Sequence, residues 1–158
     1  MLFRSPSGWM RYLMEKFDYA AQLVYAKDID STNLRDNFDV LILVGGAIPN
    51  FSASGNAARA GRDVNKAEIP AEFHPQLGRI STTTSIPQLK KFAEQGGSII
   101  AIGSSTQLAY HFQLPVSDAL VERVNGSERK LPNEKYYIPG SVLQVRTNNQ
   151  TPAGWGMP

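Results

Sequence analysis

The stretch Ile99–Tyr110 reads IIAIGSSTQLAY, and the expected fold depends on it. The apolar run Ser98–Ile102 enters a turn of small residues, and the chain then continues as a predicted helix over Ser104–Phe112. Many α/β enzymes use this succession of strand, turn and helix to lift a nucleophile above their sheet. The residue at the tip of the turn therefore decides whether the layout can carry chemistry.

A second apolar run, Val40–Val44, ends in Gly45-Gly46. Its side chains do not alternate in polarity, which is typical of a central parallel strand covered on both faces. A helix that opens after Thr84 and stops at Gly96-Gly97 leads into Ser98–Ile102. This order of elements predicts an α/β fold with a mainly parallel sheet, in which the two apolar runs lie side by side.

The N-terminal part of the chain adds a helix and a strand to this scheme. Residues 8–18 carry apolar side chains at helical spacing, so we expect Trp9, Leu13 and Phe17 to make core contacts. Gln22–Ala26 then predicts a strand. Both elements would extend the α/β core towards the N-terminus.

The remaining segments carry weaker signals. Residues 47–84 form a long connection of small and polar residues, which is usually a lid, a binding loop or disorder. Within it, His74 lacks a partner at metal-ligand spacing, so we expect an exposed or locally hydrogen-bonded side chain. Asn125-Gly126 predicts the tip of a hairpin, and Val142–Arg146 alternates like a strand.

The composition limits the number of domains and the kinds of partner that we expect. The 158 residues are 42% hydrophobic and 19% charged, which favours one domain over residues 1–158. The formal net charge of +2 gives no strong field for nucleic acid or an anionic membrane. Two basic clusters lack interleaved aromatic residues and are interpreted as solvated loops: Arg59, Arg62 and Lys66, and Arg123, Arg129 and Lys130.

The absence of cysteine removes disulfides, thiolate metal ligands and cysteine nucleophiles together. No segment approaches the roughly 18 to 20 uninterrupted apolar residues of a membrane span. We therefore expect a soluble chain without a membrane partner, a cofactor or a metal site. The sequence does not indicate the compartment.

The ends of the two apolar runs resemble the class I glutamine amidotransferase-like family. Asp39–Gly46, DVLILVGG, looks like the strand and Gly-Gly oxyanion loop of that family, and AIGSSTQLA looks like its G-x-C-x-G-x-Q nucleophile turn. With Gln107 on the glutamine of the motif, Gly103 takes the place of the cysteine. The resemblance implies a three-layer, flavodoxin-like sandwich whose nucleophile is missing, and no His-x-Glu pair is present.

Further blocks of the chain resemble a narrower group, the amidotransferase-like domain appended to zinc-carboxypeptidase-like proteins. The blocks are GWMRYLMEKF, LKKFAEQGGSIIAIGSST, IPGSVLQV and TPAGWGMP, in this order. The resemblance implies an accessory domain of a longer protein, with a peptidase domain of the same parent chain as its partner. A secreted parent would place the domain outside the cytoplasm.

A flavodoxin-like sheet normally begins with a strand before its first helix. Met1–Phe3 holds only the end of such a strand. We therefore expect a sheet edge that is unusually exposed or covered by another chain. Self-association of this chain remains open.

Three functions are weighed for the turn. The first is a non-catalytic accessory domain, in which Gly45, Gly46, Ser104, Ser105 and Gln107 form a cradle for a small ligand or anion, or in which Ser104 merely caps a helix. The second is a serine hydrolase using Ser104 or Ser105, although the sequence lacks G-x-S-x-G. The third is a phosphate or flavin site at Ser81–Ser85, for which capping of the next helix is the simpler interpretation.

Overall fold

The computed structural model describes residues 6–31, 33–51, 65–137, 140, 142–151 and 154–156. Met1–Phe3, Arg59 and Arg62, which figure in the sequence analysis, lie outside the described residues. The chain divides into two compact units, residues 1–116 and residues 117–158. Each unit is therefore described by itself.

The first unit contains two short parallel strands, β1 (Val40–Leu43) and β2 (Ser98–Ala101). Their register pairs Val40 with Ser98 and Leu43 with Ala101. The prediction that the two apolar runs lie side by side and parallel is confirmed. Within the described residues these strands form a two-stranded sheet, so the unit has a mixed α/β fold with a small parallel sheet.

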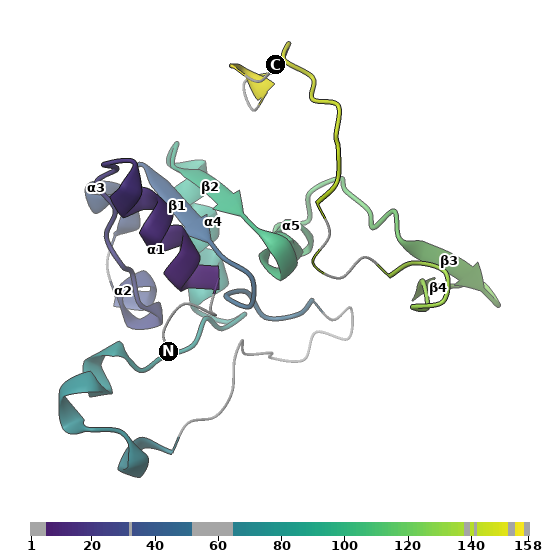
Figure 1. Ribbon diagram of the computed structural model, residues 1–158. Coiled ribbons are helices and arrows are strands. Elements are labelled where there is room, and N and C mark those ends of the chain that lie inside the picture. The colour runs from purple at the N-terminus through teal and green to yellow at the C-terminus, as the bar shows by residue number, and fades with distance from the viewer. Residues whose placement is uncertain are drawn as a thin grey trace. The chain divides into compact units, whose positions relative to one another are not determined.

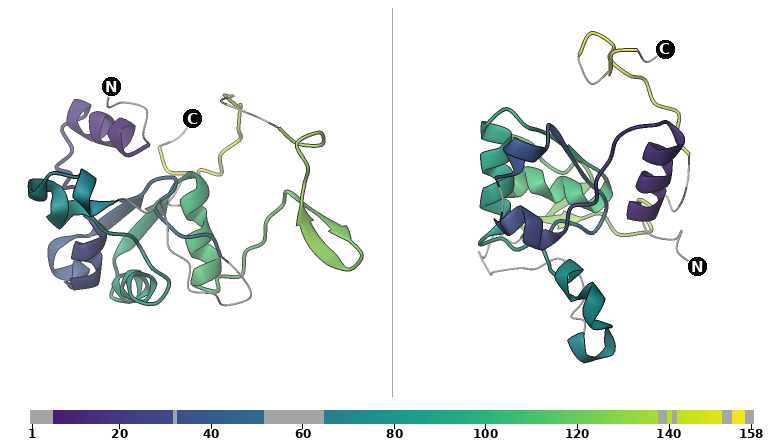
Figure 2. Two further views of the ribbon diagram at one scale, coloured as in Figure 1. Left: turned by 90° about the horizontal axis from the view of Figure 1, so that it is seen from below. Right: turned by 90° about the vertical axis from the view of Figure 1, so that its left-hand side faces the viewer.

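Helices lie on both faces of this sheet (Figures 1 and 2). On one face lies α1 (Pro6–Lys16), and on the other lie α2 (Ala26–Ser31), α3 (Leu34–Asn37) and α4 (Ser85–Glu94). The hydrophobic core forms on the side of α2 to α4. Its buried side chains are Ile29, Leu34, Leu41, Leu43, Ile48, Ile80, Ile86, Leu89, Phe92 and Leu108.

The prediction that Trp9, Leu13 and Phe17 make core contacts is wrong. None of the residues of α1 is buried, and Trp9 and Phe17 are 56% and 63% exposed. The reason is that this face of the sheet is not closely covered, since Val40 and Ile100 are 47% and 49% exposed. The face of the strands towards α1 therefore keeps part of its apolar surface exposed.

The predicted strand Gln22–Ala26 is also absent. Residues 22–25 have no regular structure, and α2 begins at Ala26. An apolar segment becomes a strand only where a neighbour completes its hydrogen-bond ladder. Within the described residues, β1 is paired with β2 alone.

Residues 65–84, the described end of the long connection, hold two short 3-10 helices, η1 (Lys66–Glu68) and η2 (Ala71–Gln76). His74 in η2 is half-buried, and its Nε2 hydrogen-bonds the carbonyl oxygens of Lys66 and Ile69 at 3.2 and 2.9 Å. The prediction of a locally hydrogen-bonded histidine is confirmed.

The segment after β2 is helical but not uniform. A 3-10 helix, η3 (Gly103–Gln107), runs directly into a single α-helical turn, α5 (Leu108–His111). The predicted helix over Ser104–Phe112 is thus present as two short pieces. The side chains of Ser104 and Ser105 in η3 reach the chain that follows β1.

The second unit contains an antiparallel hairpin of β3 (Val121–Val124) and β4 (Ser127–Lys130). Its tip is Asn125-Gly126, with φ of +52° and +80°, so the predicted hairpin is confirmed. The strand predicted over Val142–Arg146 is wrong, because these residues have no regular structure and Val142 is 99% exposed. Within this unit, the described residues offer that segment no neighbouring strand.

Substituting Gly97 tests the close packing of α4 on β2. A Cβ atom at Gly97 would lie 2.4 Å from the ring of Phe92, which is 1% exposed, so Gly97→Ala must displace that ring. We expect a loss of about 1–3 kcal/mol of unfolding free energy in urea denaturation, as for an overpacked core. The neighbouring exposed substitution Ser98→Ala should change the value by less than about 0.5 kcal/mol.

A double substitution checks the cause. If the clash with Phe92 is responsible, Gly97→Ala combined with Phe92→Leu should lose less stability than the sum of the two single changes. Additive losses would contradict the packing explanation.

Candidate functional site

The loops that follow β1 and β2 meet in space. Parallel strands end at the same edge of their sheet, so residues 44–51 and residues 103–111 emerge side by side. Ser104 Oγ accepts a hydrogen bond of 2.8 Å from the backbone N–H of Gly46. We call the side chains of Ser104, Ser105, Gln107 and His111, together with the backbone of residues 44–51, the strand-end cluster.

Ser105 lies at the centre of this cluster. Its side chain is fully buried, and its hydroxyl donates a hydrogen bond to the carbonyl oxygen of Val44. That carbonyl also accepts a 3.1 Å hydrogen bond from the N–H of Ala47, which closes the turn after β1. A buried hydroxyl needs a partner, and here the partner fixes the turn.

Two further side chains attach the next part of the loop. Gln107 Oε1 accepts a 3.2 Å hydrogen bond from the N–H of Phe51. His111 Nε2 lies 2.9 Å from the carbonyl oxygen of Pro49, so this nitrogen must be the one that carries the proton and donates. The Phe51 ring meets the imidazole edge-on, with 5.4 Å between ring centroids.

The role of His111 was missed by the sequence analysis. A signal was present, because Gln107 and His111 are four residues apart, which places both side chains on one face of a helical segment. This spacing predicts that Gln107 and His111 lie on the same face of the helical segment. It does not predict that this face contacts the backbone of Pro49 and Phe51.

Gly103 occupies the tip of the turn with a φ of +60°. Glycine adopts this left-handed conformation without the steric cost borne by other residues. The sequence therefore places glycine where the backbone is left-handed. A Cβ atom at Gly103 would be 3.7 Å from Cα of Gly45, an ordinary contact, so space is not what limits substitution here.

Among the residues that the structure describes, none supplies the cluster with the partners that an activated serine requires. A serine nucleophile needs a base in hydrogen-bond reach and a group that orients the base. Within the described residues, neither the Ser104 nor the Ser105 hydroxyl is bonded to a histidine, and His111 and His74 bond backbone carbonyls. Searched over the same residues, no three His, Cys, Asp or Glu side chains gather as a metal site.

The donors of the expected anion cradle bond within the protein. The N–H of Gly46 donates to Ser104 Oγ, and the N–H of Ser105 donates to the carbonyl of Ile102 at 3.2 Å. Ser104 does not cap the helix, because it lies inside η3 and its oxygen bonds across to the other loop. An anion at Gly46 would have to displace Ser104.

The hydroxyl-rich segment Ser81–Ser85 bonds within itself. Ser85 Oγ is fully buried and accepts from the N–H of Ser81 at 2.9 Å, and Ser81 Oγ lies 2.5 Å from Thr84 Oγ1. These hydrogen bonds fix the entry into α4. They point to a local structural role for the segment.

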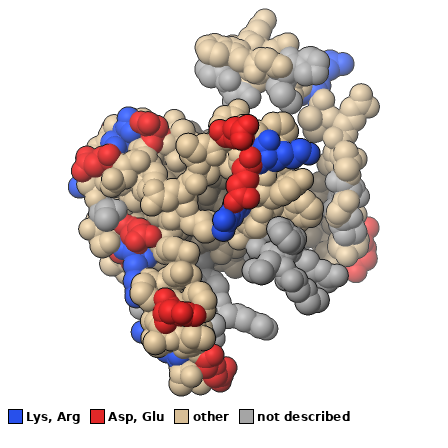
Figure 3. Space-filling model, turned by 60° about the vertical axis from the view of Figure 1, so that its left-hand side comes forward, with Lys and Arg blue, Asp and Glu red and all other residues tan. Residues whose placement is uncertain are grey.

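Charged side chains are mixed on the molecular surface. Figure 3 shows lysine and arginine interspersed with aspartate and glutamate on one face. In the described part of the chain, no helix has the length and apolar character needed to cross a bilayer.

Comparisons with protein-family models, with curated proteins and with solved structures find no match to this chain. The site is therefore interpreted from its own geometry.

The buried hydroxyl should contribute more stability than the exposed one. Ser105→Ala removes a buried hydroxyl and leaves the carbonyl of Val44 with one partner fewer, so we expect a loss of about 1–3 kcal/mol in thermal or urea unfolding. Ser104→Ala is the matched control, since Ser104 is exposed and water can replace its hydroxyl at Gly46. Equal losses for the two variants would contradict the proposed role of Ser105.

Because Gly103 has a positive φ, replacing it should cost more stability than replacing the nearby Gly45. Gly103→Ala should cost roughly 1–2 kcal/mol of unfolding free energy because of its positive φ, and Gly103→Asn should cost less. Gly45→Ala is the control, because Gly45 is outside the left-handed region and its Cβ would find its nearest neighbour, Ser104 Oγ, at 3.8 Å. A comparable loss for Gly45→Ala would show that crowding, not backbone conformation, determines the effect.

Proposed function

We propose that this chain is a non-catalytic, glutamine amidotransferase-like accessory domain of a zinc-carboxypeptidase-like protein. In this proposal the small parallel sheet is part of a three-layer, flavodoxin-like sandwich. The observation that carries the non-catalytic part is the strand-end cluster, in which both candidate nucleophiles are hydrogen-bonded to the loop after β1.

The chemistry of the cluster supports a structural use of the turn. Ser105 has no exposed surface from which to attack a substrate, and its hydroxyl is already a donor to Val44. Ser104 is exposed, but its oxygen accepts from Gly46, and no described histidine or carboxylate is hydrogen-bonded to it. Gly103, which matches the cysteine of the related motif, brings no reactive group.

An accessory role leaves two uses for the domain. The first is packing against a peptidase domain of the parent chain, whose zinc and catalytic groups would lie outside these residues. The second is binding of a small carboxylate or other anion at Gly45 and Gly46, with Ser104, Ser105 and Gln107 nearby. The second use requires Ser104 to rotate away from the N–H of Gly46, which exchanges one hydrogen bond for another.

The alternative is a serine hydrolase that uses Ser104. The observation in its favour is that Ser104 is exposed at the carboxyl end of a parallel sheet, where ligands of such folds collect. The alternative requires a histidine to reach Ser104, and the imidazole of His111 instead donates to Pro49.

Reaction with an active-site probe separates the two functions. We expect a fluorophosphonate to leave the protein unlabelled, as judged by intact mass, and we expect no release of ammonia from glutamine. Unactivated serines do not react with such probes, because the hydroxyl is a weak nucleophile near neutral pH.

The control is Ser104→Ala. Stoichiometric labelling that this variant abolishes, while Ser81→Ala retains it, would overturn the non-catalytic proposal in favour of the hydrolase. Binding of a carboxylate such as glutamate, measured by calorimetry and weakened by Gly46→Ala, would favour the ligand-binding use.

A further inference from the structure

The hairpin tip of the second unit, Asn125-Gly126, is the only Asn-Gly pair in the sequence. Both residues are exposed, and a Cβ atom placed on Gly126 would find no heavy atom within 4 Å beyond its chain neighbours. Among the residues that the structure describes, none hydrogen-bonds the N–H of Gly126 or the side chain of Asn125. The amide nitrogen of Gly126 and the side-chain carbonyl of Asn125 are therefore open to reaction and to water.

These two groups can react with each other. The nitrogen of Gly126 attacks Cγ of Asn125, its proton passes to a base in the solvent, and the side-chain nitrogen leaves as ammonia. The product is a five-membered succinimide ring. Water then opens the ring at Cγ to give aspartate, or at the main-chain carbonyl to give isoaspartate, so each conversion consumes one water and releases one ammonia.

Glycine after the asparagine favours this attack. Gly126 has no Cβ, so its nitrogen is not shielded, and its backbone reaches conformations that other residues reach only at a steric cost. The attacking nitrogen must lose its proton, so the reaction accelerates as the pH rises.

The closed turn opposes the reaction. Asn125 and Gly126 have φ of +52° and +80°, as in a type I′ turn, and Val124 pairs with Ser127 across it. The planar succinimide ring fixes the ψ of the asparagine outside the left-handed region. The ring therefore forms when the tip of the hairpin opens.

The structure of the hairpin allows this opening. Its strands have four residues each, none of β3 is buried, and the described residues add no third strand. A two-stranded hairpin by itself is marginally stable in water. The N–H of Leu131 donates to the carbonyl of Leu120 at 2.9 Å, and Lys135 pairs with Glu122, so these contacts lie towards the other end of the hairpin and not at the tip.

We propose that Asn125 is a site of spontaneous deamidation, at which water converts the hairpin tip into aspartate and isoaspartate forms. In isoaspartate the backbone runs through Cβ and Cγ, which adds one methylene to the turn. A loop of two residues places Val124 opposite Ser127, so the isoaspartate form loses that pairing. This inference does not rest on the proposed function, because the hairpin contains no residue of the strand-end cluster.

Ageing of the full chain in mildly alkaline buffer tests the proposal. Peptide mapping follows the peptide that contains Asn125, whose mass rises when the amide becomes a carboxyl group. The new carboxylate also lowers the formal net charge from +2 to +1, so the product separates by ion exchange. We expect aspartate and isoaspartate at Asn125, formed at a rate that increases with pH.

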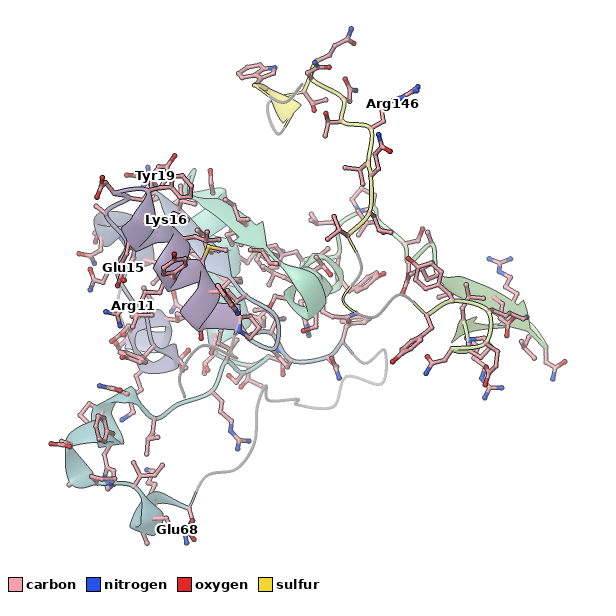
Figure 4. The ribbon with its side chains drawn as sticks, viewed as in Figure 1. Arg11, Glu15, Lys16, Tyr19, Glu68 and Arg146 are labelled. Atoms are coloured by element: carbon pink, nitrogen blue, oxygen red, sulfur yellow. The ribbon has the colours of Figure 1, made fainter. Side chains whose placement is uncertain are left out.

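Asn148 is the control in the same sample. It is also exposed, it lies two residues after Arg146, which Figure 4 labels, and it is followed by Asn149. Its Oδ1 accepts a 3.0 Å hydrogen bond from the N–H of Gln150. We expect conversion at Asn148 to be at least about tenfold slower, because a residue with a Cβ shields the attacking nitrogen.

Gly126→Ala tests the role of the glycine. The added methyl group shields the nitrogen and meets no neighbour, so conversion at Asn125 should be at least about tenfold slower. The positive φ strains this variant in the closed turn and favours opening, so slower conversion cannot come from a more stable hairpin. If Gly126→Ala does not fold, Asn125→Asp serves instead, and the mass of its peptide should stay constant.

A parallel sample in urea measures the protection that the closed turn gives. Because a marginal hairpin opens often, we expect conversion in the native protein to be less than about tenfold slower than in the unfolded protein. A larger protection would overturn the proposal. Equal rates at Asn125 and Asn148 would also overturn it, as would an unchanged rate in Gly126→Ala or a mass gain at the same position in Asn125→Asp.

Discussion

The parallel pairing of β1 with β2 determines where every other part of the first unit lies. Parallel strands need a crossover between them, and here the crossover contains α4, whose Leu89 and Phe92 are buried in the core. The same pairing brings both carboxyl ends to one edge. The loops that follow therefore have to share that edge, and Ser105 joins them there through the carbonyl of Val44.

Sharing the edge has a chemical consequence. Side chains at the carboxyl ends of parallel strands are normally available to a ligand, but four of them here bond to the backbone of residues 44–51. Each such bond satisfies a loop amide or carbonyl that would otherwise depend on water. Polar groups used in this way stabilise the loop.

The sequence predicts the parallel pair and the hairpin because each depends on a strong local signal. The unalternating run Val40–Val44 and the dipeptide Asn125-Gly126 are examples. The bonding of Ser104 to Gly46 joins residues 58 positions apart, and no local pattern encodes such a partner. Gln22–Ala26 and Val142–Arg146 fail for a related reason, since a strand pattern states a preference and the neighbour decides the outcome.

The contrast between the two sides of β1 follows from this dependence on neighbours. Towards β2, the groups of Asp39 and Leu43 are paired and the strand is held in register. On the other side, no described residue hydrogen-bonds the backbone of Val40 and Ile42, and residues 22–24 lack a ladder of their own. The strand pattern of Gln22–Ala26 is therefore not enough to form a strand, because the described residues supply no partner backbone for it.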